Sequence, residues 1–385
     1  MRVLVATQPG SSVFFQLVPL ARALHGAGHE VLVATSRRFG PVVSRIGLSY
    51  RAAGIDWLEA AVAETFPEVA EHRHDPHGAL VRFIVDLFVR RTALPFASDV
   101  ASWIGQWKPD LLLHSSNELG GAAAAEAAGV PHLMVMAGLD NWFDRIAPAL
   151  AGTDEARKAV GLAPAHGDAG WLFAHGLLLA EAPGWSTHSL EGLGVSWLRP
   201  VSPEQPRGDE RWLEELPRPL AHVTLGTVFN KLARPLFVPL ASGAARAAAS
   251  VVVTVGEDAD PDAFSGLPAN VHVRRYLPLD ALLERCDAVL AHGGWGTVVA
   301  CAEAAVPMAA LILGADQGYN AALVERAGFG FGFEPKDCAP DHVAELTRRL
   351  LSAPELRAGA ARQAAALRAV PSPADVAASL AQRFA

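Results

Sequence analysis

The chain has 385 residues, of which 51% are hydrophobic and 19% are charged. This composition excludes a disordered or low-complexity protein, and the length suffices for two domains that each have their own core. The formal net charge is −8 and no block of lysine or arginine occurs, which excludes a broad nucleic-acid-binding surface but allows a small pocket for an anion.

The first elements predicted along the chain form a β-α-β unit. Residues 2–7 (RVLVAT) and 30–35 (EVLVAT) are predicted as buried strands. Between them, apolar residues recur at helical spacing from Leu17 to Leu24, and glycines at 26 and 28 end the helix. Two strands joined by one helix are expected to lie parallel in one sheet.

The rest of the first half continues this alternation. Strands are predicted at 110–114 and 131–138, so residues 1–145 are typical of a doubly wound parallel sheet. The stretch 41–110 is mostly helical and rich in aromatic residues. Its histidines lack the spacing and the cysteine or carboxylate partners of a metal site, so we expect a loop there and no metal: His72, His74 and His77.

Prolines mark a change of character near residue 200. We expect an acceptor-binding domain at 1–200, a linker at 201–216 and a second α/β domain at 217–370. Residues 371–385 are predicted as an amphipathic helix that packs back on the first domain. The fold class is therefore α/β with two doubly wound parallel sheets.

The cysteines and the N-terminal segment indicate in which cellular compartment the protein is expected. The cysteines are odd in number and none has CxxC spacing, which disfavours disulfides and indicates a reducing cytoplasm: Cys286, Cys301 and Cys338. The N-terminus lacks the long apolar stretch of a signal peptide, and no window of 18 apolar residues occurs. We expect a cytoplasmic protein without membrane insertion.

The strongest chemical signal is a glycine-rich turn between a strand and a helix. A predicted strand ends at His292 and is followed by Gly293-Gly294-Trp295-Gly296-Thr297. Glycines allow the backbone to approach a ligand, and the amides at a helix start favour phosphate. The turn lacks the GxxxxGK[ST] pattern of a P-loop, and no GxGxxG follows the first strand, so a dinucleotide site is disfavoured.

A second polar motif follows about twenty residues later. Asp316 and Gln317 come directly after a predicted strand. A carboxylate and an amide together can bind several sugar hydroxyls. The alternative is that the pair caps the helix that follows.

These motifs together resemble the family 1 glycosyltransferases of the GT-B fold, especially actinobacterial enzymes that decorate antibiotics. The matching segments are HGGWGT, GADQGYNA, VTLGTVF and the opening MRVLVATQPG with LVPLARALHGAGHEVLVAT. The resemblance covers nearly the whole chain except 40–110. It implies two Rossmann-like domains facing across a cleft, with the acceptor held by the first and the nucleotide sugar by the second.

The resemblance also assigns roles to individual residues. It places the donor phosphates at Thr227, His292, Gly294, Trp295, Gly296 and Thr297. It places the nucleobase at Tyr276 and Leu277 and the sugar at Asp316 and Gln317. The implied donor is a TDP- or UDP-sugar that acts as co-substrate, with no separate cofactor and no metal.

The sequence departs from the family at the position of the general base. The family has Pro-Gly-x-Gly-His after the first strand, and here Val13 stands where that histidine would be. A valine cannot accept the proton of an acceptor hydroxyl. Three interpretations stay open: another base, for which we predict Asp140 or else His114; an acceptor that needs no strong base; or a chain that binds a nucleotide sugar without catalysis.

The acceptor is expected to be an apolar aromatic or polyketide-type small molecule. We predict that Ser12, Val13, Phe14 and Trp142 line its pocket, with core packing as the alternative for the aromatic residues. The predicted function is an inverting, metal-independent transfer of a sugar to this acceptor. The alternatives are a nucleotide-sugar epimerase and a non-catalytic helper, and a homodimer or an activating partner protein is compatible with the sequence.

Overall fold

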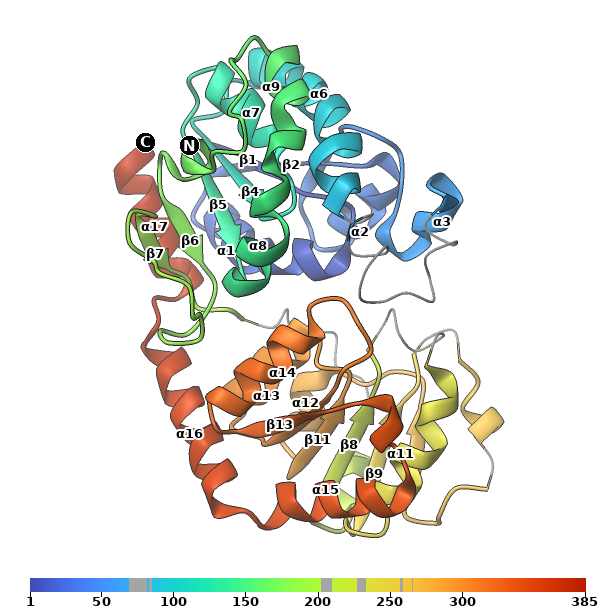
Figure 1. Cartoon of the computed structure of the whole chain (residues 1–385). Helices are drawn as coiled ribbons and strands as arrows, with labels where there is room; N and C mark the ends of the chain where they lie inside the picture. The colour runs from blue at the N-terminus through green and yellow to red at the C-terminus, as the bar shows by residue number, and fades with distance from the viewer. Residues whose placement is uncertain (69–81, 83–84, 202–209, 227–232, 257–258, 265) are drawn as a thin grey trace. The chain divides into compact units, whose positions relative to one another are not determined.

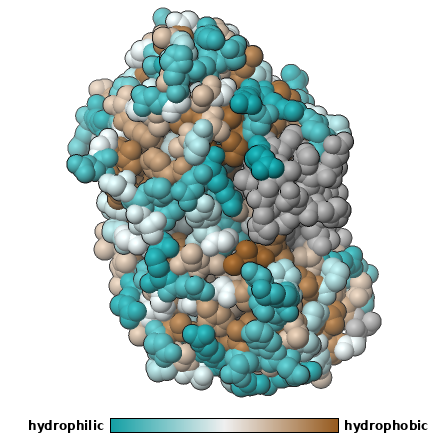
Figure 2. Space-filling model, viewed as in Figure 1, coloured by the Kyte–Doolittle hydropathy of each residue, from teal (hydrophilic) through white to brown (hydrophobic). Residues whose placement is uncertain are grey.

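The computed structural model describes residues 1–385 except 69–81, 83–84, 202–209, 227–232, 257–258 and 265. The chain divides into two compact units, residues 1–200 with 370–385 and residues 201–369. Each unit is built around one parallel sheet covered by helices (Figure 1). Figure 2 shows polar side chains interspersed with apolar ones over the visible surface. In the part of the chain that is described, no helix is long and apolar enough to cross a membrane.

The first unit contains a seven-stranded sheet in the order β3-β2-β1-β4-β5-β6-β7. Its strands are β1 (Arg2–Ala6), β2 (Glu30–Thr35), β3 (Ser49–Ala52), β4 (Leu111–Ser115), β5 (His132–Met136), β6 (Leu177–Leu179) and β7 (Val195–Trp197). All neighbours pair in parallel. The strand order reverses between β1 and β4, and ligands of such sheets bind at the carboxyl ends of the strands near that reversal.

Helices on both faces bury this sheet. They are α1 (Ser11–Gly26), α2 (Gly40–Arg45), α3 (Val62–Thr65), α6 (Ala93–Trp107), α7 (Gly120–Ala127), α8 (Leu139–Arg145), α9 (Asp154–Ala159) and α17 (Pro373–Phe384). A π-helical turn, η3 (Leu87–Thr92), precedes α6. The C-terminal helix α17 packs on α1 and buries Val376 and Leu380 in the same core as Leu17.

The second unit contains a six-stranded parallel sheet in the order β10-β9-β8-β11-β12-β13. Its strands are β8 (Leu220–Thr224), β9 (Ser250–Thr254), β10 (Val271–Arg274), β11 (Ala288–Ala291), β12 (Met308–Leu311) and β13 (Gly330–Phe333). Its helices are α11 (Phe237–Ala244), α12 (Leu279–Leu283), α13 (Trp295–Glu303), α14 (Gln317–Arg326), α15 (Pro340–Ser352) and α16 (Pro354–Ala369).

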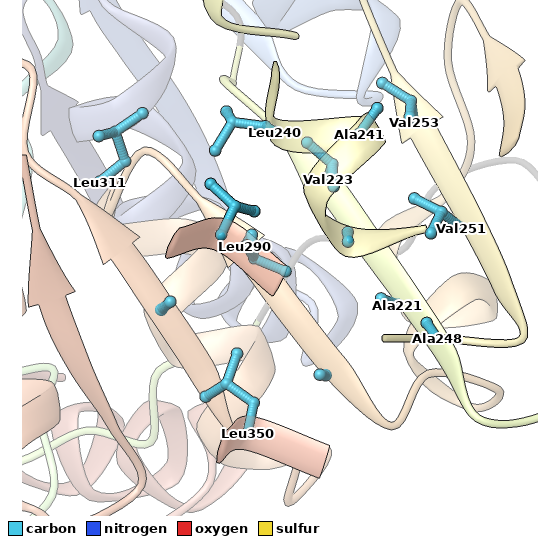
Figure 3. Close-up of a cluster of buried hydrophobic side chains, with 14 of the residues drawn as sticks. Ala221, Val223, Leu240, Ala241, Ala248, Val251, Val253, Leu290, Leu311 and Leu350 are labelled. Carbon is cyan, nitrogen blue, oxygen red and sulfur yellow. The ribbon is translucent and has the colours of Figure 1, made fainter. Parts of the chain in front are cut away.

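The central strands of the second unit are mostly apolar because both of their faces are buried. Figure 3 shows Val223 of β8 and Val253 of β9 beside Leu240 and Ala241 of α11, and Leu290 of β11 and Leu350 of α15 belong to the same buried cluster. Because helices cover both faces of a parallel sheet, its strands are apolar on both sides. The prediction of two doubly wound parallel sheets is therefore confirmed. The short strands β6 and β7, of which β7 forms an edge of the sheet, were not predicted, since three residues are too few to show a periodicity.

Buried histidines make the stability of both units depend on pH. Burial lowers the pKa of His114 to about 3 and that of His132, His222 and His292 to about 4. An unfolded histidine titrates near 6.5, so the unfolded chain binds more protons between pH 6.5 and about 4, and stability is lost as the pH falls through that window. Burial raises the pKa of Glu118 to about 8, which acts oppositely, since stability then falls as the pH rises from 4.5 to 8.

His132 offers a direct test of this acid sensitivity. Its imidazole is buried, and neither ring nitrogen has a hydrogen-bond partner among the described residues. Between pH 7.5 and 4.5, the unfolding free energy of the wild type is expected to fall by about 2–3 kcal/mol more than that of His132→Phe. Urea unfolding at the two pH values measures this difference. His166→Asn, at an exposed histidine, is the control. Equal acid losses in wild type and His132→Phe would contradict this origin.

Candidate donor and acceptor sites

The glycine turn lies where β11 ends and α13 begins. Gly293 has φ +65°, and Gly294 is the extended residue before the nine-residue helix. β8 pairs directly with β11, so Thr224 lies opposite Ala291 and the two strand ends are adjacent. The N–H groups at the start of a helix point toward its N-terminus and carry the positive end of the helix dipole, and here the amide of Thr297 also donates to the Gly294 carbonyl at 3.0 Å. The turn therefore offers backbone donors to an anion at the carboxyl edge of this sheet.

His292 is held between two glycines. A Cβ added at Gly226 would lie 2.2 Å from the His292 ring, and one added at Gly294 would lie 2.4 Å from its Nε2. Gly226 also has φ +69°, a conformation that favours glycine. The low pKa of His292, about 4, results from burial. At neutral pH the ring is therefore uncharged and presents one N–H donor beside the turn.

Asn320 connects the glycine turn to the loop that carries Asp316. Its Nδ2 donates to the Gly293 carbonyl at 2.8 Å and to Asp316 Oδ2 at 3.0 Å. The sequence prediction missed this residue, although it lies one helical turn after Asp316. Through Asn320, the glycine turn at 293–297 and the loop that carries Asp316 are therefore fixed relative to each other.

Gln317 has a different role from Asp316 in this structure. Its side chain is 1% exposed, and its Oε1 accepts from the amides of Leu313 and Gly314 at 2.6 and 2.9 Å. It braces the loop at the start of α14, whereas Asp316 is half-buried. The predicted contact of Gln317 with a sugar stays a prediction, and in this structure its oxygen is already shared by two backbone donors.

The other predicted donor residues lie at the same edge of the sheet. Tyr276 and Leu277 follow β10, and the Tyr276 ring is 47% exposed, as a surface for base stacking requires. Gly296 is exposed, and Trp295 and Thr297 are half-buried in the first turn of α13. Thr227 lies outside the described residues.

The predicted acceptor residues at the start of α1 divide into exposed and core positions. Ser12 is exposed and Val13 is half-buried, whereas Phe14 is fully buried against Phe39. Sequence reasoning missed Glu59, whose Oε2 lies 1.8 Å from where a Cβ on Gly10 would be. A carboxylate thus sits at the N-terminus of α1, close to the segment that carries Val13.

Trp142 is also a core residue. It is 1% exposed, its ring packs edge-on against Phe143 and Phe173, and its Nε1 donates to the Ser116 carbonyl at 2.8 Å. The alternative of core packing therefore describes Trp142 and Phe14 in this structure, since neither side chain offers surface to a ligand.

Asp140 lies in the first turn of α8, directly after β5. Its carboxylate accepts from Thr187 N at 2.8 Å, from Thr187 Oγ1 at 2.8 Å and from His188 N at 3.1 Å. A carboxylate has about four acceptor positions, and on Asp140 three donors from the loop after β6 already occupy such positions. The geometry is that of a loop anchor, and the role of Asp140 as general base stays a prediction.

His114, the second predicted base, is placed unfavourably for that role. The side chain is 0% exposed, and its Nδ1 lies 3.0 Å from the carbonyl oxygen of Glu118. Burial lowers its pKa to about 3, so the ring is a weak base. An acceptor hydroxyl cannot reach a fully buried imidazole without movement of the chain around it.

Sequence reasoning also missed a histidine–aspartate pair beside Asp140. His188 Nε2 lies 2.9 Å from Asp144 Oδ1, and the His188 ring stacks on Phe143 with centroids 5.3 Å apart. The two residues are 44 positions apart, so spacing gave no signal. Within the described ranges, no group of three or more potential metal ligands occurs.

Comparison with known proteins identifies relatives along most of the chain. The profile of the Erythromycin biosynthesis protein CIII-like N-terminal domain matches residues 22–161, and that of the C-terminal domain matches residues 240–382. The chain is 32% identical to an L-demethylnoviosyl transferase of Streptomyces niveus, over 90% of this chain and 88% of the relative. It is 26% identical to a 3-alpha-mycarosylerythronolide B desosaminyl transferase of Saccharopolyspora erythraea, over 98% and 96%.

Solved structures agree with this result. The glycosyltransferase VinC in complex with dTDP superposes with a TM-score of 0.80 at 25% identity, covering 99% of both chains. SnogD from Streptomyces nogalater superposes with a TM-score of 0.78 at 27% identity, covering 100% of this chain and 99% of that one. Both are named as glycosyltransferases, and their folds extend over both units of this chain.

Proposed function

The chain belongs to the Erythromycin biosynthesis protein CIII-like glycosyltransferases, and from this membership we propose that it transfers a deoxysugar from a TDP-sugar to a polyketide or aromatic hydroxyl with inversion at C1. It has the GT-B fold of its structural neighbours. Relatives named as transferases of demethylnoviose, desosamine and daunosamine support a deoxysugar donor. The three buried free thiols fit a reducing cytoplasm as the place of action.

On the donor side, the proposal assigns the pyrophosphate to the start of α13. The amides after Gly294, the Thr297 hydroxyl and the His292 N–H supply donors, and the helix dipole stabilises the negative charge that develops on the leaving TDP. Thr227 and Trp295 join this set by resemblance. Tyr276 and Leu277 hold the base, and Asp316 contacts the sugar while Gln317 and Asn320 hold its loop.

In the reaction, the acceptor oxygen forms the new bond to C1 while the bond from C1 to the phosphate oxygen breaks. The electron pair leaves with TDP, and the acceptor proton passes to a base. The donors at the start of α13 act on the phosphate as a metal ion does in other transferases, so the proposed step requires none. The candidate bases all lie in the 1–200 unit, at the carboxyl ends of its strands.

His292→Ala is expected to weaken TDP binding about tenfold or more, because the ring supplies a donor that a methyl group cannot replace. Isothermal titration calorimetry with TDP measures this change. His222→Ala is the control, since it removes a buried histidine of β8, in the same unit, whose Nδ1 lies 3.1 Å from the Val252 carbonyl. Equal TDP affinity in wild type and His292→Ala would remove His292 from the phosphate site.

The observation that carries the proposal is the glycine turn held against His292 and Gly226 at the end of β11. The test incubates the protein with TDP-glucose, TDP-rhamnose or UDP-glucose and a panel of phenols and macrolactones. Mass spectrometry detects the glycoside, and NMR of the anomeric carbon reports inversion. Donor consumed without acceptor would favour the epimerase alternative, and donor bound without any turnover would favour the helper.

A further inference from the structure

We propose that His188, oriented by Asp144, is the base that takes the proton of the acceptor hydroxyl. The inference rests on the proposed function and identifies the group that stands in for the histidine replaced by Val13. His188 Nε2 donates to Asp144 Oδ1 at 2.9 Å, and the ring lies on Phe143 at an interplanar angle of 23°. A base held by a carboxylate on its far side is the arrangement of an activated catalytic pair.

The position of His188 is fixed by a network around the start of α8. Asp140 accepts from the backbone of Thr187 and His188, and Glu181 accepts from Leu139 N at 2.9 Å and from the Ser186 hydroxyl. Both carboxylates thus tie α8 to residues 186–188. Burial raises the pKa of Glu181, and the neighbouring Asp140 carboxylate contributes to this rise. The imidazole is therefore held before a substrate arrives.

The ring remains accessible despite this restraint. The side chains of His188 and Asp144 are 37% and 45% exposed. Because Nε2 carries the proton shared with Asp144, Nδ1 on the opposite side of the ring accepts the acceptor proton. The resulting imidazolium is stabilised by the Asp144 carboxylate, while the C1–phosphate bond breaks and TDP leaves. An imidazole also suits neutral pH as a base better than a carboxylate.

The other candidates nearby are less suited. The Asp140 oxygens already accept three donors. The Glu59 carboxylate lies at the N-terminus of the 16-residue helix α1, a position where a helix favours a negative charge. His114 is fully buried. His188 combines an orienting carboxylate, that of Asp144, with a side chain that is 37% exposed.

The test compares His188→Gln with wild type in the release of TDP from TDP-glucose, using 4-methoxyphenol, 4-nitrophenol and water as acceptors. His188→Gln is expected to lower kcat for 4-methoxyphenol about a hundredfold with TDP affinity unchanged. The loss should be smaller for 4-nitrophenol, which ionises near neutral pH without help. The dependence of kcat on pH in the acid range is expected to be weaker in His188→Gln than in the wild type. Asp144→Asn should cause a smaller loss.

Two controls separate the possible outcomes. His342→Gln removes a different exposed histidine–aspartate pair, with Asp337, and should leave kcat unchanged. Glu59→Gln tests the competing carboxylate. Unchanged kcat in His188→Gln, or a larger loss in Glu59→Gln, would overturn the assignment to His188. A wild type that binds no TDP would refute the proposed function itself. A wild type that binds TDP but releases none from TDP-glucose with any of the three acceptors would refute the assignment of a base.

Discussion

Asp140→Asn is expected to lower kcat by about a hundredfold or more while TDP binds with unchanged affinity. The carboxylate receives two backbone amides and one hydroxyl from Thr187 and His188. Asparagine has a single acceptor oxygen, so its NH₂ group would face one of these donors. The loop after β6 would then move, and His188 with it.

The pH profile of Asp140→Asn distinguishes an anchor from a base. If Asp140 positions His188, kcat falls but any loss of rate in acid remains, because the base itself is unchanged. If Asp140 is itself the base, that loss of rate disappears in Asp140→Asn. Glu155→Gln, at an exposed carboxylate of α9, is the control. An unchanged kcat in Asp140→Asn would contradict both roles.

Trp142→Ala is expected to lower the unfolding free energy of the first unit by about 3–5 kcal/mol. The indole is 1% exposed, packs on Phe143 and Phe173, and donates to the Ser116 carbonyl. Its loss leaves a cavity and a buried carbonyl without its donor. Urea unfolding followed by circular dichroism measures the change.

Trp142→Phe provides the matched comparison, because it keeps an aromatic ring and removes only the N–H. We expect it to cost about 1–2 kcal/mol, mostly from the lost hydrogen bond. A loss below 1 kcal/mol in Trp142→Ala would show that α8 is not held by this side chain. Since Asp140 and Asp144 flank Trp142 on the same helix, kcat should fall with stability in Trp142→Ala.

The sequence predicted the sheets and the donor turn because both depend on local patterns. Apolar runs between glycines predict parallel strands. The glycines at 293, 294 and 296 follow one such run and precede a helical pattern, so the sequence alone places the start of a helix there. The aromatic residues of the acceptor side were harder to place. Phe14 and Trp142 could pack in the core or line a pocket by sequence alone, and burial decided for the core.

The candidate base depended on contacts that no local pattern encodes. Asp140 meets Thr187 across 47 positions, and Asp144 meets His188 across 44. These pairs form because β5 and β6 are neighbours in the sheet, which brings the start of α8 next to the loop after β6. Glu59 reaches Gly10 in the same way, through the loop after β3.

The most direct test of the account is a thermal-shift panel with TDP, UDP, GDP, ADP and NAD. A ligand at a hundred times its Kd stabilises the folded protein by about 2.7 kcal/mol, which corresponds to several degrees. We expect a shift with TDP that exceeds the shift with GDP, ADP or NAD, and we expect His292→Ala to reduce it. No shift with TDP, or an equal shift with ADP, would contradict a donor site for a TDP-sugar at the end of β11.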